Sequence, residues 1–301
     1  MVRTVVAGLD GSRESRGAAE WAAREAALRG LPLTIVHVAE PVPLPWAQAP
    51  LLGEETRARW SERISRETAD GLRLRHPGVD LAVVRLAGRA ADLLSAAAAD
   101  AELIALGSRG MSGVAGYLVG SVGQAVIART QVPVVLVRAG EQAADEHESD
   151  PVGIPSAATA FRPVVLGLDT AGPAEELIRF AFDEADRRRT ALRVVHAWAL
   201  PTYYLYGLSL DAGLHDKIAR DKGAELAEAL RAWRRKFPAV EVGEESRSGS
   251  AAALLIDAAH AASLVVVGRR VRRAPVGPHI GPVAHAVLHH APAPVAVVAH
   301  D

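Results

Sequence analysis

A cluster of five glycines, the last of them followed by a serine, comes after the apolar run 101–106, in the segment GSRGMSGVAGYLVGS (107–121). Glycine loses more conformational freedom on folding than any other residue, so this cluster indicates a backbone that something approaches closely. The last part, SVGQ, predicts a helix with Ser121 at its N-cap and Gln124 three residues later. Unobstructed N–H groups at the start of a helix bind anions, because the helix dipole is positive there. The chemistry that the segment favours is the binding of a polyphosphate by main-chain amides.

A second polar loop, DGS at 10–12, follows the apolar run 4–9. In an open parallel sheet, ligands lie outside the carboxyl ends of the strands, where the strand order reverses. If the order is 3-2-1-4-5, the strands before these two loops are neighbours and the loops face one crevice. Two other interpretations stay open: the glycine segment as a surface loop without a ligand, and Asp10 as a helix N-cap.

These loops need short buried strands and intervening helices to position them. The apolar runs are nearly continuous and rich in Val, Leu and Ile, which is typical of parallel strands buried on both faces. In the first half of the chain they are 4–9, 33–38, 81–86, 102–106 and 133–137. Helical stretches lie between them, at 13–30, 53–75, 89–100 and 121–130. The alternation predicts a doubly wound α/β domain with right-handed crossovers.

The whole pattern occurs twice. VVAGLDGS (5–12) returns as VVLGLDTA (164–171), and PVVLV (133–137) returns as PVAVV (294–298). The first pair is offset by 159 residues and the second by 161, and a near-constant offset indicates a duplicated domain. We predict one domain over 1–140, a polar linker over 141–160 and a second domain over 161–301.

The spacing Gly107-x2-Gly110-x9-Gly120-Ser121 resembles the G-x2-G-x9-G-[ST] motif of ATP-binding universal stress proteins. VVAGLDGS, TIVHV and PVVLV are similar to strands 1, 2 and 5 of that family. The resemblance extends over both halves, so the chain looks like a tandem universal stress protein. It implies two Rossmann-like domains, each with a five-stranded parallel sheet in the order 3-2-1-4-5.

The resemblance also implies which residues bind the nucleotide. Asp10 would meet the ribose or adenine side, and the main chain of Val38 would hydrogen-bond adenine. The segment 107–113 would wrap the phosphates, and the start of the following helix would hold the terminal ones. The complete set is Gly8, Asp10, Ser12, Val38, Gly107, Ser108, Arg109, Gly110, Met111, Ser112, Gly113, Gly120, Ser121 and Val122. The implied cofactor is ATP, and any Mg²⁺ would be held mainly by phosphates and water.

The second copy departs from the motif. Gly110 corresponds to Val271, Ser121 to Pro282 and Ser12 to Ala171. Valine avoids positive φ and proline lacks an N–H donor, so the cradle is damaged. Four arginines between 269 and 273 could replace the lost donors with side-chain charge, or form a solvated basic loop. Weaker contributors to a second nucleotide site are Gly167, Asp169, Gly268 and Gly281.

Composition narrows the function further. The formal net charge is −1, so the overall charge does not indicate a nucleic-acid or membrane partner, and we expect neither. There is no cysteine, which excludes disulfides, thiolate metal sites and cysteine nucleophiles. The apolar stretch at the N-terminus is too short for a signal peptide, so we expect a cytoplasmic protein. His285 and His289, one helical turn apart, are interpreted as surface or interface residues, and no residue is predicted as catalytic or as a metal ligand.

We therefore expect an ATP-binding regulator of stress or dormancy, in which nucleotide binding orders the 107–121 loop for an unidentified protein partner. Two alternatives stay open: a slow ATPase or phosphotransferase, and a structural interaction protein without nucleotide. The apolar last strands would be exposed sheet edges if left alone. The family resemblance suggests that they pair in an intrachain pseudo-dimer, and a further homodimer stays open.

Overall fold

The computed structural model describes residues 3–40, 54–110, 117–118, 120–154, 156–172, 174–199, 212–271 and 280–301. The chain divides into two compact units, Met1–Ala143 and Ala144–Asp301. The domain limits given above, with a linker over 141–160, stay a prediction.

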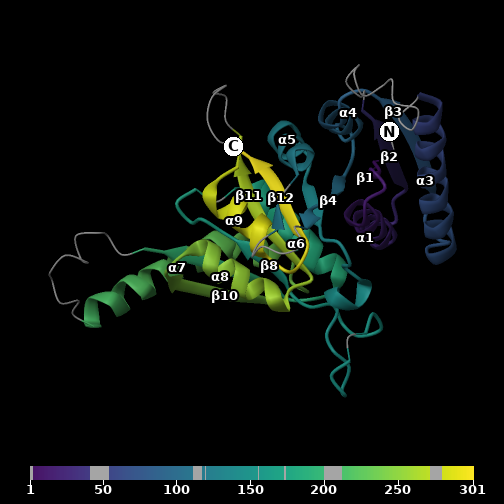
Figure 1. The fold of residues 1–301 in the computed structure, drawn as a ribbon. Helices are drawn as coiled ribbons and strands as arrows, with labels where there is room; N and C mark the ends of the chain where they lie inside the picture. The colour runs from purple at the N-terminus through teal and green to yellow at the C-terminus, as the bar shows by residue number, and fades with distance from the viewer. Residues whose placement is uncertain are drawn as a thin grey trace. The chain divides into compact units, whose positions relative to one another are not determined.

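In the first unit, strands and helices alternate along the chain (Figure 1). They are β1 (Val5–Leu9), α1 (Arg13–Arg29), β2 (Leu33–Ala39), α3 (Glu54–Arg75), β3 (Leu81–Ala87), α4 (Ala90–Ala97), β4 (Leu103–Gly107), β5 (Arg109–Gly110), β6 (Tyr117–Leu118), α5 (Ser121–Arg129) and β7 (Val134–Val137). The main sheet is parallel in the order β7-β4-β1-β2-β3, and β5 and β6 form a separate antiparallel pair. The predicted order 3-2-1-4-5 is confirmed.

Helices cover both faces of this sheet. α1 and α3 contact each other and pack on one face, and α4 and α5 contact each other and pack on the other. All five residues of β1 are buried, as expected for a central parallel strand. β3 differs from the expectation, because none of its residues is fully buried: Leu81, Val83 and Leu86 are half-buried and the others are exposed. The physical reason is its place as the outermost strand, where one face is only partly covered by α3.

The second unit repeats the arrangement. Its elements are β8 (Val164–Gly167), α6 (Glu175–Arg188), β9 (Leu192–Trp198), α7 (Ala212–Lys236), β10 (Val242–Ser248), α8 (Ala251–Ala258), β11 (Leu264–Arg270), α9 (Pro282–His290) and β12 (Val295–His300). Its strands are parallel in the order β12-β11-β8-β9-β10. The duplication inferred from the offset therefore corresponds to two copies of one fold.

The ends of α1 show why the first helix stops where predicted. Gly30 adopts a left-handed conformation with φ 62°, and its N–H donates to the carbonyls of Ala26 and Ala27. This is the helix ending that glycine favours. The corresponding residue after α6 is Arg189, whose φ of 50° makes it the one non-glycine residue with positive φ in the described parts of the chain.

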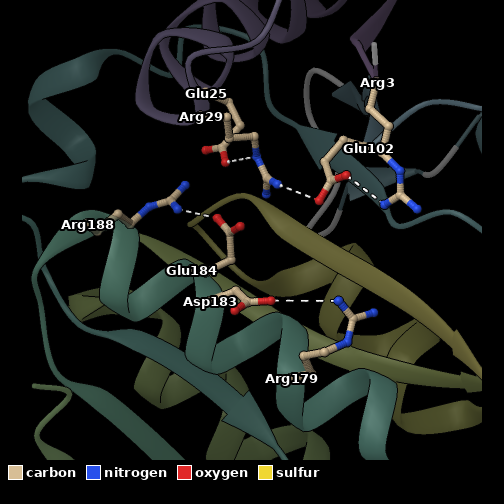
Figure 2. Close-up of polar contacts among 8 residues, drawn as sticks. All are labelled: Arg3, Glu25, Arg29, Glu102, Arg179, Asp183, Glu184 and Arg188. Atoms are coloured by element: carbon tan, nitrogen blue, oxygen red, sulfur yellow. Dashed lines mark hydrogen bonds and ion pairs between the residues drawn. The ribbon is translucent and has the colours of Figure 1, made fainter. Parts of the chain in front are cut away.

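Each of these two helices carries a buried ion pair one turn before its end (Figure 2). In α1, Arg29 Nε donates to Glu25 Oε1 at 2.6 Å, and Arg29 also contacts Glu102 at 3.3 Å. In α6, Arg188 pairs with Glu184, and both side chains are fully buried. Such pairs are costly to break, because the remaining charge stays buried.

Glu20 joins α1 to the end of α3. It accepts hydrogen bonds from Arg75 and lies 2.8 Å from His76 Nε2. Desolvation alone would raise the pKa of Glu20, but the hydrogen bonds with Arg75 and His76 outweigh it and hold the pKa below its ordinary value of 4.5.

The segment expected to be a linker contains hydrogen-bonded structure. The main chains of Glu148 and Ala160 are joined by a 2.8 Å hydrogen bond, and His147 and Phe161 form a bridge. Asp150 Oδ1 accepts the N–H groups of Val152 at 3.0 Å and Ile154 at 2.8 Å. The polar composition of the 141–160 segment thus includes a turn that a carboxylate stabilises.

No helix in the described parts of the chain has both the length and the apolar character that crossing a bilayer requires.

Candidate functional site

The loop after β1 is fixed by a short chain of hydrogen bonds. Asp10 Oδ1 accepts the N–H of Ser12 at 3.0 Å and its hydroxyl at 2.6 Å. Ser12 Oγ in turn accepts the N–H of Ser15 at 3.1 Å, so Ser12 is the N-cap of α1. Gly11, between them, has φ 86°. Asp10 therefore stabilises the N-cap residue Ser12 but is not itself the N-cap. Its carboxylate is held at the carboxyl end of β1.

Gly107 ends β4 against the first turn of α1. A Cβ built on Gly107 would lie 2.5 Å from the main-chain carbon of Glu14 and 2.6 Å from the N atom of Ser15. Its φ is not positive, so the sharp exit from the strand does not demand glycine. The close approach that this glycine permits is that of another helix, which brings the β1 and β4 loops together.

The start of α5 differs from the predicted capping box. Gly120 is the N-cap, with φ −61° and ψ 153°, and Ser121 is the first helical residue. The N–H of Gln124 donates to the Gly120 carbonyl, and no side chain caps the helix. The reason is that the helix begins one residue early, which places Ser121 in the helix and leaves glycine without a side-chain acceptor. The N–H groups of the first turn thus have no capping side chain.

β2 passes the end of β1. The pairing between these strands stops at Leu9 opposite His37, so Val38 has no partner in β1. The carbonyl of Ala39 accepts the N–H of Gly88, on the β3 side. Since successive residues of a strand direct their main-chain groups to opposite sides, those of Val38 are directed to the β1 side.

His37 anchors this strand end and is a core residue. It is buried, with Nδ1 2.7 Å from the Leu9 carbonyl and Nε2 2.8 Å from Ser61 Oγ. Its place in the second unit is taken by His196, also buried, with Nδ1 3.0 Å from the Leu168 carbonyl. Both histidines hold the carboxyl ends of two strands together.

A cavity of about 100 Å³ lies where these pieces meet. Eight residues predicted for the nucleotide site line it: Gly8, Asp10, Ser12, Val38, Gly107, Gly120, Ser121 and Val122. They come from β1, β2, β4 and α5, which are far apart in the sequence. The structure therefore brings together the two loops that the strand order predicted would face one crevice.

The rest of the predicted set is placed differently. Ser108 is buried and does not line the cavity, because its N–H donates to the Val137 carbonyl at 2.8 Å. Arg109 and Gly110 form β5 beside β6. Met111, Ser112 and Gly113 lie outside the described residues.

Part of the cavity wall was not predicted from the sequence. Val36 and Val38 are two apart on β2 and face the same side, a periodicity that could have identified Val36. Leu94 comes from α4, and a Cβ on Gly8 would lie 3.4 Å from its side chain. Glu14 and Ser15 enter through the first turn of α1. No local signal assigns these helical residues to a site, because their position depends on how the helices pack.

The charged side chains of the described wall are those of Asp10 and Glu14. Both are acidic, so an anion in this part of the cavity would depend on main-chain donors. Among the described residues, no group of three or more His, Asp and Glu side chains is arranged to hold a metal ion.

The second unit has a larger cavity of about 510 Å³ at the corresponding place. Gly167, Asp169, Gly268 and Gly281, the weaker predicted contributors, all line it. Of the arginines between 269 and 273, Arg270 lines the cavity, whereas Arg269 is buried and does not. Burial lowers the pKa of Arg269. Arg272 and Arg273 lie outside the described residues.

Comparison with known proteins agrees with the duplicated fold. The model of the universal stress protein family matches residues 1–138 and 160–299. Universal stress protein Rv2005c of Mycobacterium tuberculosis is 34% identical over 97% of this chain and 96% of its own length. Universal stress protein Rv2623 of the same organism is 32% identical over 97% and 95%.

Solved structures show the same architecture. A universal stress protein from Archaeoglobus fulgidus superimposes with a TM-score of 0.70 at 18% identity, covering 99% of this chain and 98% of that one. At this identity the likeness supports the fold alone. The family match over both halves and the mycobacterial relatives carry the assignment, and the chain belongs to the universal stress protein family.

Proposed function

We propose that the first unit binds ATP in the crevice formed by the loops after β1 and β4 and the start of α5. The observation that carries the proposal is that eight residues predicted from the glycine motif, the strand order and the family resemblance line one cavity. Their common location is the carboxyl end of a parallel sheet at its switch point, where such folds bind ligands.

The adenosine end would lie toward β2. The main-chain groups of Val38 are directed to the side where β1 has ended, and they offer a donor and an acceptor to the edge of a base. Val36 and Leu94 supply apolar wall for the ring. Asp10, held by Ser12, presents a carboxylate that accepts hydrogen bonds from ribose hydroxyls.

The phosphate end would lie against α5. Gly120, Ser121 and Val122 line the cavity, and no side chain caps their helix. The first-turn N–H groups and the positive end of the dipole suit phosphate oxygens. Enclosed ligand sites usually measure about 300–1,000 Å³, so a cavity of about 100 Å³ would hold only part of the nucleotide. The predicted contributors around the phosphates also include Arg109, Gly110, Met111, Ser112 and Gly113. Any Mg²⁺ would be bound mainly by the phosphates and water.

Calorimetric titration of the full chain with ATP and Mg²⁺ tests the proposal. Gly120→Val adds a branched side chain to the cavity wall, at a φ of −61° that any residue adopts, so the backbone is not strained. The expected result is at least a tenfold loss of affinity, about 1.4 kcal/mol. Gly78→Val is the matched control, since a Cβ at Gly78 meets nothing within 4 Å and its φ is not positive. Equal affinity of the two variants and the unaltered protein would overturn the proposal.

Binding of ATP to the folded form alone would also stabilise it. At a free ligand concentration of 100 Kd the gain is about 2.7 kcal/mol. This linkage is how a bound nucleotide could order the glycine segment for a protein partner. The partner, a homodimer and the pairing of the last strands of the two copies stay predictions.

Two other functions are separated by direct assays. Slow hydrolysis or phosphoryl transfer would need a base near the phosphates, and the described wall offers Asp10 and Glu14. Rapid phosphate release in a single turnover, abolished in Asp10→Asn, would favour the enzyme. A nucleotide-independent interaction protein would carry no adenine nucleotide in native mass spectra.

A further inference from the structure

The crevice of the second unit differs from that of the first in size and in chemistry. Its volume is about 510 Å³ against about 100 Å³. It lies at the carboxyl ends of β8, β9 and β11, between the starts of α6, α8 and α9. Its volume falls in the range of small-molecule sites.

The start of α6 also differs from the start of α1. α1 begins three residues after Asp10, whereas α6 begins six residues after Asp169. Ala171 stands where Ser12 caps α1, and Ala174, the N-cap of α6, makes no side-chain cap. Neither Ala171 nor Ala174 supplies the side-chain acceptor that Ser12 supplies to α1.

Two basic side chains occupy the mouth of this crevice. β11 and β12 continue to Arg270 and His300, which are paired directly across the two strands. In the first unit the corresponding strands end at Gly107 and Val137. The longer strands therefore add an arginine and a histidine at the end of the sheet where the first unit has its glycine segment.

Both side chains point to the crevice. Arg270 Nη2 lies 3.8 Å from a Cβ built on Gly172, across the opening. His300 Nε2 lies 2.7 Å from a Cβ built on Gly268, while Nδ1 is 2.9 Å from the main-chain oxygen of Asp301. Within the described residues, the side chain of Arg270 forms no ion pair or hydrogen bond.

Beyond Arg270 and His300, the wall is largely apolar. Side chains from strands and helices on several sides contribute: Leu168, Leu177, Val195, Leu255, Val267 and Ile280. Pro282, the first residue of α9, offers no N–H where Ser121 has one. The site thus has fewer main-chain donors and more side-chain charge than a polyphosphate cradle. Asp169, whose Oδ1 accepts the N–H of Ala171, repeats the contact that Asp10 makes with Ser12, so this carboxylate does not distinguish the two crevices.

We propose that this crevice binds a small monocarboxylate with an aliphatic body, a ligand class different from the nucleotide of the first unit. The carboxylate lies between Arg270 and His300, since guanidinium and carboxylate groups form two parallel hydrogen bonds. The aliphatic body packs against the leucine and valine side chains. Burial of each CH₂ group should strengthen binding about fourfold.

The test uses decanoate as the probe and calorimetric titration of the full chain below the concentration at which decanoate forms micelles. One decanoate per chain is expected. Arg270→Gln and His300→Gln should each weaken it at least tenfold. Arg179→Gln is the matched control, because Arg179 is a half-exposed arginine of α6 that pairs with Asp183 at 3.7 Å and does not line the crevice (Figure 2).

A second pair of measurements separates carboxylate recognition from non-specific hydrophobic binding. Decanol has the same aliphatic body without the charge and should bind at least tenfold more weakly; equal binding would overturn the proposal. Ala251→Leu, at the half-buried first residue of α8, fills the crevice from a helix that tolerates leucine and should reduce decanoate affinity. Decanoate binding that is unchanged in all three crevice variants would also overturn it.

The outcome is independent of the nucleotide proposal. Gly120→Val should leave decanoate affinity unchanged, because Gly120 lies in the other unit. ATP that competes with decanoate in the Gly120→Val protein would assign the second crevice to nucleotides and overturn the monocarboxylate. Failure of ATP to bind the first unit, with decanoate binding intact, would overturn only the nucleotide proposal.

Discussion

Gly107 and Gly268 occupy the same position in the two copies, yet alanine should affect them differently. At Gly107 the added methyl would lie 2.5–2.6 Å from main-chain atoms of α1. Carbon atoms in contact prefer separations of about 3.5–4.0 Å, so the first turn of α1 must withdraw by about 1 Å. At Gly268 the methyl would meet the ring of His300 at 2.7 Å and a methyl group of Leu177 at 3.1 Å, both side-chain atoms that can rotate away.

The magnitudes follow from these contacts. Overpacking against a fixed backbone costs about 1–3 kcal/mol. Replacing glycine by alanine at a φ both residues adopt returns about 0.4–1 kcal/mol through the unfolded chain. We therefore expect Gly107→Ala to destabilise the first unit by about 1.5 kcal/mol. Gly268→Ala should change the stability of the second unit by less than about 0.5 kcal/mol, because the two terms nearly cancel.

Hydrogen exchange resolved by peptide is the suitable assay, because it reports the two units separately. Amides of α1 should exchange about tenfold faster in Gly107→Ala, and amides of α6 should be unchanged in Gly268→Ala. Unchanged exchange of α1 in Gly107→Ala, or equal acceleration of the two helices by their own substitutions, would refute the reasoning.

Three further predictions concern α1 and α6. Glu184→Gln should destabilise the second unit by about 3 kcal/mol in urea, since it leaves the fully buried Arg188 without its carboxylate; a change under 1 kcal/mol would contradict this. Arg189→Gly should raise the melting temperature, because a left-handed non-glycine residue costs about 1 kcal/mol; a lower one would show that its side chain outweighs the strain. Because its folded pKa is depressed, Glu20 contributes stability that is complete above pH 4.5 and is lost as the pH falls through the folded pKa, so Glu20→Gln should lose less stability on acidification in urea titrations.

Much of the fold could be predicted because local signals and burial agree. The run 33–38 became β2 over Leu33–Ala39, and Gly30 ended the helix predicted to start at 13. Buried parallel strands carry their own signature, since both faces are apolar. The burial of β3 was less well predicted, because its apolar run resembles that of the central strands and its outermost position appears only once its neighbours are known.

The cavity wall was predictable at the strand ends and at the start of α5. Asp10 and Gly107 follow from the loops and the strand order, Gly8 follows from the family resemblance, and all three line the cavity. The contribution of Glu14 and Leu94 depends on helix packing, which no short motif encodes. The capping box failed because a single-residue shift in the start of α5 exchanges the roles of glycine and serine.

The paired charges near the ends of α1 and α6 have a consequence for heating. Hydration of ions becomes less favourable as temperature rises, so the penalty for keeping Glu25 with Arg29, and Glu184 with Arg188, away from water declines. Hydrophobic burial does not gain in the same way. These two ion pairs should therefore contribute a larger share of the folding free energy as the temperature rises.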